Sequence, residues 1–333
     1  MLSTFLWLVL IVVLALAGAG VFAYYWVHKP LSLPKPTVDL RVPAGSSPSQ
    51  IARTLVEEGV AMPPQAFVWL VRLTEKDRDI KAGGYQIQAG DSLWDIVQRM
   101  ASGDVSHRRV GFIEGWTVNQ IIETVAKHPD IEQTIDSNTL ADQEALAAHL
   151  GIEYPHVEGL LFPDTYVFAV GTPDHEILKR AIDTQADVLE QAWANRSKDL
   201  PLKTPYEALI LASIIEKETG KSDERARIAG VFINRLRVGM PLQTDPTVIY
   251  GMGDRYQGRI RKADLQRDTP WNTYTRPGLP PTPIASVSRA SLEAALNPEA
   301  HGYFYFVAKG DGSSAFAKNL AGHNRNVRKY ILK

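Results

Sequence analysis

The sequence predicts an α+β protein with three parts. These are an N-terminal transmembrane helix, a region of strand–helix repeats and a mainly helical domain with a small β-sheet. Three observations carry this prediction. An uncharged apolar run lies near the N-terminus, one spacing of Gly, Ser or Thr, and Ile occurs three times, and long helical patterns fill the second half. At 333 residues the chain is long enough for about two domains.

The apolar run near the N-terminus predicts a membrane anchor over residues 1–28. No charged side chain occurs from Phe5 to Trp26, and at ~1.5 Å per residue a helix of this length reaches roughly 33 Å, enough to cross a bilayer core. The aromatic residues at 24–26 suit the membrane interface. The alternative is a cleaved signal peptide, because Val21-Phe-Ala23 resembles a cleavage site. The length of the run and the lack of preceding basic residues favour the anchor.

Residues 29–37 hold three prolines and predict a stiff spacer. Lys29, Lys35 and Arg41 follow the span, and no basic residue precedes it. The distribution of basic residues alone therefore places the main body in the cytoplasm.

The composition excludes several classes of function. The net charge is −1, from 36 Lys and Arg against 37 Asp and Glu, so no basic field favours nucleic acid. The chain has no cysteine, which excludes disulfides, iron–sulfur clusters and thiol nucleophiles. Its eight histidines show no metal-ligand spacing. We therefore expect neither a metal nor another cofactor.

Residues 38–130 are expected to form a repeat region. Gly45, Gly90 and Gly115 are each followed by Ser or Thr two residues on and by Ile six residues on. This spacing predicts a strand that ends at a Gly turn, a hydroxyl residue that caps a helix, and an Ile that is the first buried residue of that helix.

The middle copy, Tyr85-Gln-Ile-Gln-Ala-Gly-Asp-Ser-Leu-Trp-Asp-Ile96, closely resembles the opening of a LysM module. The LysM family binds glycans that contain N-acetylglucosamine, so the resemblance implies contact with glycan. A unit that only spaces other parts of the chain is an equal alternative, because one short motif does not define a binding groove.

Residues 131–333 are expected to form one domain that begins with a helical connector over 131–150. Helical patterns follow, and Tyr303–Val307 predicts a strand with a turn at 309–312. The helical patterns cover about 176–194, 206–219 and 226–238.

The helix predicted to end near Gly220 carries the strongest candidate for acid–base chemistry. Glu218 lies three, four and seven residues after Ile215, Ile214 and Leu211, so it follows the apolar stripe, whereas Glu216 shares a less apolar side. A carboxylate in the last turn feels the negative end of the helix dipole, and burial adds to this. Both effects raise a pKa, as a general acid at neutral pH requires. The alternative is a pair of surface residues at a frayed helix end.

Two loops are rich in amides, hydroxyls and aromatic rings, which suit sugar binding. They are Met240–Gly251 and Trp271–Pro281. The alternative is ordinary turn chemistry, because the same residue types form loops.

Together these segments closely resemble the endolytic murein transglycosylase MltG (YceG-like) family over essentially the whole chain. The anchor and the LysM-like copy are followed in order by the family's other motifs. These are Glu158-Gly-x-x-x-Pro-Asp-Thr-Tyr166, Ala212-Ser-Ile-Ile-Glu-Lys-Glu-Thr219, Val231-Phe-Ile-Asn-Arg-Leu236, Leu242-Gln-Thr-Asp-Pro-Thr-Val-Ile-Tyr-Gly251 and Asn272-Thr-Tyr274. Trp271 departs from the expected Tyr by a conservative aromatic change.

The resemblance implies a single-pass inner-membrane protein with its catalytic body in the periplasm, against the orientation that charge alone indicates. It implies a lyase that cuts nascent peptidoglycan strands internally and leaves a 1,6-anhydro end on the muramic acid residue. Its partners would be peptidoglycan strands and peptidoglycan synthases of the penicillin-binding class.

Residue by residue, the resemblance implies Glu218 as the catalytic acid and base, because Glu followed by Thr219 matches the transglycosylase pattern. The residues implied to contact the sugars are Gln243, Thr244, Asn272, Thr273, Tyr274, Glu158, Asp164 and Tyr166. Two alternatives stay open. One is a hydrolytic muramidase with Asp245 or Asp164 as second carboxylate, and the other is a tethered glycan-binding scaffold without activity.

Overall fold

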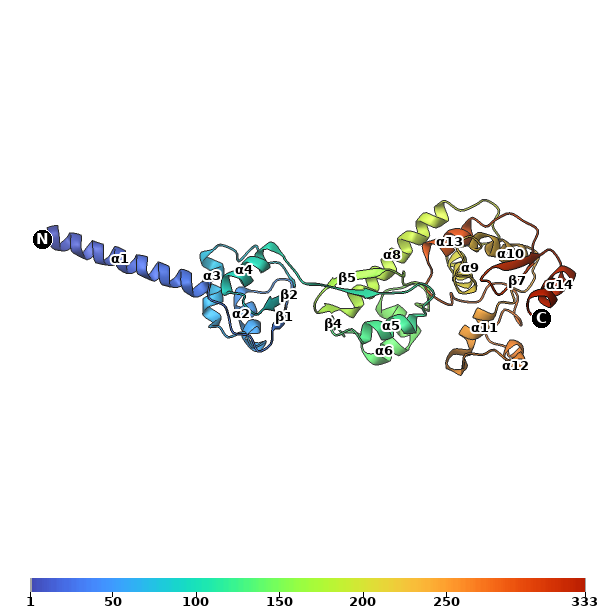
Figure 1. Ribbon diagram of the computed structural model, residues 1–333, viewed down its shortest axis with the longest axis horizontal. Helices are drawn as coiled ribbons and strands as arrows, with labels where there is room; N and C mark the ends of the chain where they lie inside the picture. The colour runs from blue at the N-terminus through green and yellow to red at the C-terminus, as the bar shows by residue number, and fades with distance from the viewer. Residues whose placement is uncertain (1, 333) are drawn as a thin grey trace. The chain divides into compact units, whose positions relative to one another are not determined.

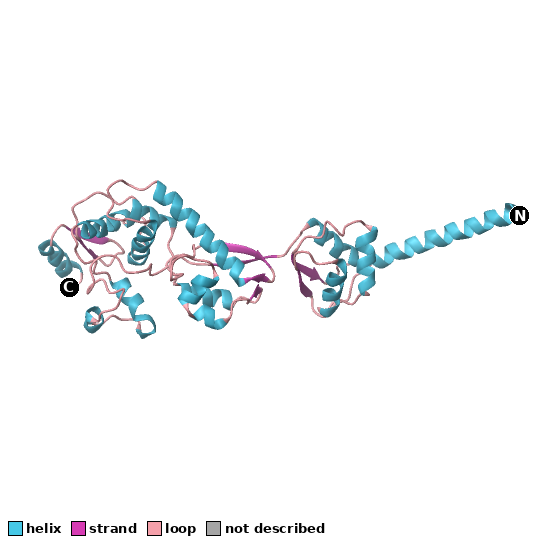
Figure 2. Ribbon diagram, turned by 180° about the vertical axis from the view of Figure 1, so that it is seen from behind, coloured by secondary structure: helices cyan, strands magenta, loops and turns pink. Residues whose placement is uncertain are grey.

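A computed structural model describes residues 2–332. The fold is mixed, with one long apolar helix at the N-terminus, many shorter helices and four two-stranded sheets in the described residues (Figures 1 and 2). The chain forms two compact units. Unit 1 holds the residues up to Arg109 together with Pro129–Glu132 and Val167–Thr172, and unit 2 holds the remainder.

Unit 1 begins with α1 and continues as a small α+β body. Its elements are α1 (Leu2–Val27), β1 (Thr37–Val42), α2 (Pro48–Glu57), α3 (Pro64–Leu73), β2 (Gly83–Gln88) and α4 (Leu93–Ser102). Strands β1 and β2 pair antiparallel, with Leu40 opposite Tyr85. Alternate residues of β1 are buried, so one face of the pair covers the helices. Within α1, the span from Phe5 to Val27 is long and apolar enough to cross a membrane.

The three copies of the repeated spacing have the local structure that the sequence predicts. Ser47, Ser92 and Thr117 each cap a helix through a capping box. The glycine before each cap has a positive φ, 78° at Gly45 and 104° at Gly90, which the turn requires. The isoleucine is buried in each copy, with an exposure of at most 3%. It is the first buried residue of its helix only in α2, because Leu93 in α4 and Val118 in α5 are buried ahead of it.

The third copy belongs to unit 2, so the region expected over 38–130 is divided between the units. The physical reason is a pair of backbone hydrogen bonds. The N–H of Gly115 donates to the carbonyl of Ser286 at 3.0 Å, and the N–H of Ser286 donates to the carbonyl of Trp116 at 2.7 Å. The turn that precedes the third helix is therefore fixed to a segment far along the chain.

Unit 2 is mainly helical. Its helices are α5 (Val118–Ala126), α6 (Ser137–Ala141), α7 (Gln143–His149), α8 (Asp174–Ala194), α9 (Pro205–Glu218), α10 (Arg225–Arg237), α11 (Asp245–Met252), the 3-10 turn η1 (Gly253–Arg255), α12 (Lys262–Gln266), α13 (Arg289–Leu296) and α14 (Leu320–Tyr330). Strands β7 (Tyr305–Ala308) and β8 (Ser314–Ala317) form its hairpin. Four short strands lie at or close to the points where the chain passes between units. Strand β3 (His107–Gly111) pairs with β5 (Thr165–Ala169), and β4 (Ile131–Glu132) pairs with β6 (Thr172–Pro173).

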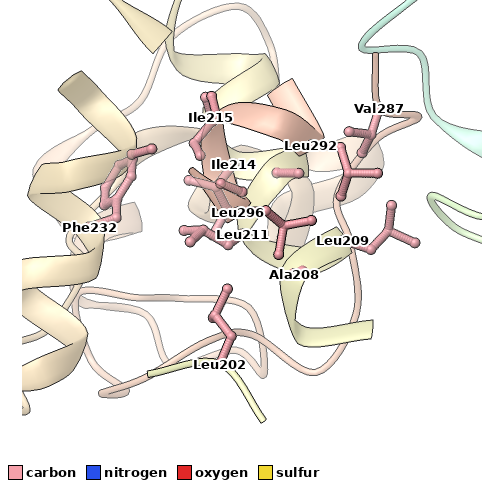
Figure 3. Packing of buried hydrophobic residues seen from close by; sticks show 14 of the residues in the cluster. Leu202, Ala208, Leu209, Leu211, Ile214, Ile215, Phe232, Val287, Leu292 and Leu296 are labelled. Carbon is pink, nitrogen blue, oxygen red and sulfur yellow. The ribbon is translucent and has the colours of Figure 1, made fainter. Parts of the chain in front are cut away.

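Helix α9 is the centre of the unit 2 core. Every residue from Ala208 to Ile215 is buried, as expected for a helix that is apolar all round. Leu211, Ile214 and Ile215 lie among side chains of α10 and α13, including Phe232 and Leu292 (Figure 3). This packing fixes the position of the last turn of α9, which carries the two glutamates.

The predicted helices over 176–194, 206–219 and 226–238 correspond to α8, α9 and α10, each within two residues of its observed bounds. The strand predicted at Tyr303–Val307 begins two residues later, at Tyr305. The difference arises because the N–H of Tyr303 donates to the imidazole of His301 at 3.1 Å instead of joining the hairpin.

Candidate active site

Glu218 is the last residue of α9, and Thr219 is the C-cap with an extended backbone. Thr204 caps the other end of the helix, with its side chain accepting from the N–H of Glu207, and Pro205 follows at the first turn. The chain therefore leaves the helix one residue before the Gly220 at which the sequence predicts the stop.

Glu218 lies in a cleft of about 450 Å³ whose walls come from four parts of unit 2. One wall is the loop before α11 with the first residue of that helix, another is Tyr274, a third is Arg235 of α10, and the last comes from β7 and α14. The lining residues are Glu218, Arg235, Gln243, Asp245, Tyr274, Tyr305, Phe306, Val307, Leu320 and His323. Polar groups and aromatic rings meet here, as a sugar-binding site requires.

Burial is the main influence on the Glu218 carboxyl, and it raises the pKa of this group to about 7. The hydroxyl of Thr244 donates a hydrogen bond to the Oε1 atom and lowers the pKa in part. The negative charge of Asp245 raises the pKa, and the positive charge of Arg235 lowers it. The result is a carboxyl that is partly protonated near neutral pH, which suits a group that must both donate and accept a proton.

Glu216 differs from Glu218 in having a full set of structural partners. Its side chain is only 6% exposed, it accepts hydrogen bonds from the N–H of Ser288, at 3.0 Å, and from the Ser288 hydroxyl, and Arg225 lies 3.8 Å away. Glu216 therefore connects α9 to the start of α13, and the alternative of two surface glutamates at a frayed helix end is wrong for this residue.

The loop before α11 places Gln243 and Thr244 beside Glu218. Gln243 has a φ of 45°, in the left-handed region that a residue other than glycine rarely adopts. Two hydrogen bonds from this loop to Thr273 hold the conformation: the N–H of Gln243 donates to its carbonyl and the N–H of Thr244 to its hydroxyl, both at 3.1 Å. Gln243 is exposed in the cleft, whereas Thr244 is buried with its hydroxyl on Glu218.

Asn272 and Thr273 are both buried and lie behind the cleft wall. The amide nitrogen of Asn272 donates to the carbonyls of Arg267, at 2.7 Å, and Leu265, at 3.1 Å. Its oxygen accepts from the N–H of Tyr274 at 2.8 Å. These bonds fix the loop that presents Tyr274, whose hydroxyl donates to the carboxylate of Asp245 at 2.6 Å.

Glu158, Asp164 and Tyr166 do not line the cleft. Glu158 is 2% exposed and accepts from the N–H of Val118 and from the Tyr250 hydroxyl, both at 3.1 Å. Burial raises the pKa of Glu158 to about 7. Tyr166 is buried and donates to the carbonyl of Phe162 at 2.8 Å, and the exposed Asp164 accepts from the N–H of Thr165.

Sequence reasoning missed the side chains that complete the cleft from distant segments. Arg235 is 7% exposed, donates to the carbonyls of Phe304, at 2.7 Å, and Leu242, at 2.5 Å, and lies over the ring of Tyr305. The ring of Tyr305 stacks on His323 of α14, with 5.2 Å between the centroids. Arg235 lies within a motif that carries the family resemblance, whereas nothing in the sequence pattern marks His323.

Within residues 2–332, no group of three or more histidine or acidic side chains is arranged to hold a metal ion.

The chain matches the model of the YceG-like family over residues 40–329. It belongs to the YceG-like family. A relative in Bacillus subtilis (strain 168), named endolytic murein transglycosylase, is 34% identical over 312 residues, which cover 89% of this chain and 86% of the relative. A relative of the same name in Streptococcus pneumoniae serotype 2 (strain D39) is 28% identical over 95% of this chain and 63% of its own length.

Among solved structures, a yceG-like protein of Listeria monocytogenes has a TM-score of 0.56 and 30% sequence identity to this chain. The likeness covers 87% of this chain and 98% of the Listeria chain. The fold is therefore shared over most of the length of both chains.

Proposed function

We propose that this chain is an endolytic murein transglycosylase, a lyase that cleaves peptidoglycan glycan strands internally. The observation that carries the proposal is the Glu218 carboxyl in a polar and aromatic cleft, with its pKa raised to about 7. The relatives in Bacillus subtilis and Streptococcus pneumoniae that carry this name support the same reaction.

The first step is general acid catalysis by protonated Glu218. The carboxyl donates its proton to the glycosidic oxygen between N-acetylmuramic acid and N-acetylglucosamine. The bond from C1 of the muramic residue to this oxygen breaks, and its electron pair stays on the departing oxygen. The muramic C1 gains oxocarbenium character, and the oxygen of the residue's own 2-acetamido group can share the positive charge.

The second step uses the same side chain as a base. Ionised Glu218 accepts the proton of the C6 hydroxyl of the muramic residue, and the O6 oxygen forms a bond to C1. The product is a 1,6-anhydromuramic end, no water is consumed, and Glu218 is protonated again. One carboxyl acts twice, so the paired carboxylates of ordinary glycosidases are not required.

The neighbours of Glu218 suit both of these proton transfers. The Thr244 hydroxyl donates to the carboxyl and stabilises its ionised form between the steps. Gln243 and Tyr274 present amide and hydroxyl groups at the cleft surface, where they can orient the sugars and their acetamido groups. Asn272 and Thr273 act through these two residues, because their own side chains are covered.

The nature of the product tests this proposal against hydrolysis. Incubating the full chain in detergent with purified glycan strands should give 1,6-anhydro ends, which mass spectrometry of the muropeptides identifies. Reducing ends would instead indicate a muramidase with Asp245 as second carboxylate. No cleavage by folded protein would favour a glycan-binding scaffold.

We also propose that α1 anchors the chain in the inner membrane, with unit 2 in the periplasm where peptidoglycan lies. The length and apolar character of Phe5–Val27 support the anchor, and a cell-wall substrate supports the orientation. The LysM-like copy would contact glycan, and a peptidoglycan synthase would supply nascent strands. A periplasm-dependent reporter fused to the C-terminus should be active, and activity of a cytoplasm-dependent reporter there would contradict the orientation.

A further inference from the structure

Helix α3 of unit 1 carries two apolar faces, although only one of them is needed for the core. Phe67, Leu70 and Val71 are buried against the rest of the unit. Trp69 and Leu73 lie outside this face and are 61% and 78% exposed. A large exposed apolar surface of this kind marks a contact site.

The second face of α3 forms an apolar groove with the end of α1. The groove has a volume of about 410 Å³, and no charged side chain lines it. Helix α3 contributes Ala66, Trp69, Leu70 and Leu73, a spacing that places them on one side of the helix. Helix α1 contributes Phe22, Ala23, Tyr24, Trp26 and Val27.

This groove lies at the end of the segment that can cross a membrane. The span of 23 residues from Phe5 to Val27 reaches about 34 Å, a little more than the ~30 Å of a bilayer core. Its last turns therefore lie at the depth of the lipid headgroups. Because Trp69 and Leu73 line the same groove as Phe22, they lie at this depth as well.

The end of α1 is fixed to unit 1, so α3 stays beside it. Trp26 and Val27 pack against the core of the unit. The ring of His28 stacks on Trp94 with 5.3 Å between centroids, and the N–H of Leu31 donates to the carbonyl of Asp91 at 2.9 Å. A span in the bilayer would therefore hold the exposed face of α3 against the lipid.

The charges around Trp69 suit lipid headgroups. A second hollow that Trp69 lines also contains Arg53 and Arg72 and no acidic residue. Asp77 shares a separate hollow with Arg72, and Glu57 shares another with Arg53. An apolar stripe flanked by arginines, with Trp at its centre, is typical of helices that lie in a membrane interface.

We propose that α3 is an interfacial membrane-contact helix. Trp69 and Leu73 enter the headgroup–acyl boundary of the membrane that α1 spans, and Arg53 and Arg72 contact lipid phosphates. The occupant of the groove is lipid, because the groove is continuous with the membrane-spanning helix. This proposal rests on the anchor proposed above, and it makes unit 1 a body that lies on the bilayer surface.

The lack of cysteine allows a depth measurement on the full chain. Single variants L73C and W69C would carry an environment-sensitive fluorophore, in protein reconstituted in phosphatidylethanolamine–phosphatidylglycerol nanodiscs. S102C is the matched control, because Ser102 is exposed at the end of α4 remote from the Trp94 that stacks on His28. L16C reports the middle of the span. Quenching by spin-labelled lipids and by a water-soluble quencher is then compared among the four positions.

We expect lipid quenching at Leu73 and Trp69 to exceed that at Ser102 severalfold, with the water-soluble quencher showing the reverse order. Quenching at Leu73 and Trp69 equal to that at Ser102, with Leu16 strongly quenched, would overturn the interfacial helix and leave the anchor intact. Protection of Leu73 from both quenchers would also overturn it, because a protein contact would then cover the face. A Leu16 label that lipid does not quench would overturn the anchor itself.

Discussion

At the scale of single residues, the two glutamates of α9 have opposite surroundings although they lie two positions apart. Glu216 has three structural partners, namely the N–H and hydroxyl of Ser288 and the guanidinium of Arg225. Glu218 has one donor, Thr244, and faces the negative charge of Asp245. In the proposed mechanism Glu218 is the carboxyl that exchanges a proton with the sugar, whereas Glu216 holds α9 to the start of α13.

We expect Glu218→Gln to lose turnover by roughly 10²–10⁴-fold or more, because one residue performs both proton transfers. The variant should stay folded and still bind glycan strands. Glu216→Gln is the matched control and should keep most of its activity while losing about 1–2 kcal/mol of unfolding free energy with its charge-assisted bonds. The rate at which each variant forms anhydro ends, measured at equal fractions of folded protein, distinguishes Glu218→Gln from Glu216→Gln. An inactive Glu216 variant beside an active Glu218 variant would contradict the assignment.

Activity should fall as the pH rises through about 7, because the protonated form of Glu218 starts the reaction. Thr244→Val keeps the shape of the side chain and removes the donor that lowers this pKa. The falling limb of the pH–rate profile should therefore move to higher pH in the variant. If the falling limb lies at the same pH in the variant and in the parent chain, a group other than Glu218 controls it.

The same carboxyl predicts how stability depends on pH. The folded-state pKa of Glu218 lies above its ordinary value of 4.5, so the folded protein holds a proton that the unfolded chain has lost. Stability from this group is complete below pH 4.5 and declines as the pH rises towards about 7. Thermal unfolding of Glu218→Gln should show a smaller decline over this window than the parent chain.

At the scale of elements, the cleft depends on loops held by buried polar residues. Asn272→Ala removes two bonds to carbonyls and the acceptor for the N–H of Tyr274. We expect it to lower the free energy of unfolding by about 2–3 kcal/mol, because buried groups lose their partners. Turnover should fall much less than in Glu218→Gln. Thr275→Ala in the same loop is the control, and equal losses in both variants would contradict a special role for Asn272.

The sequence predicts elements better than it predicts sites. The caps of the three repeat helices and the positions of α8, α9 and α10 depend on neighbours along the chain, so local patterns indicate them. Asn272 and Thr273 show the limit, because the residue types that bind sugars also hold loops together, and sequence alone does not separate the two uses. Glu216 and His323 show another limit, because some of their neighbours are distant in the sequence. Ser288 lies 72 positions from Glu216, and Arg235, which lines the cleft with His323, lies 88 positions from it (323 against 235).

At the scale of the whole molecule, the division of the repeats changes what a deletion removes. A deletion of residues 38–104 takes away most of unit 1 and retains α5. A deletion of 38–125 also removes α5, whose first N–H binds the buried Glu158. We expect the shorter deletion to weaken binding to insoluble peptidoglycan but to keep turnover of soluble strands, and the longer deletion to lose both. Pull-down with sacculi and product analysis check this, and unchanged sacculus binding by the shorter variant would reduce the repeats to a spacer.

The chain passes from one unit to the other five times, after residues 109, 128, 132, 166 and 172. A chain that alternates between units in this way would restrict recombination between related genes. A single crossover between two genes would join part of a unit from one parent to the rest of that unit from the other parent. One crossover therefore cannot exchange a whole unit. Changes in unit 1 and changes in the cleft of unit 2 would then be inherited together.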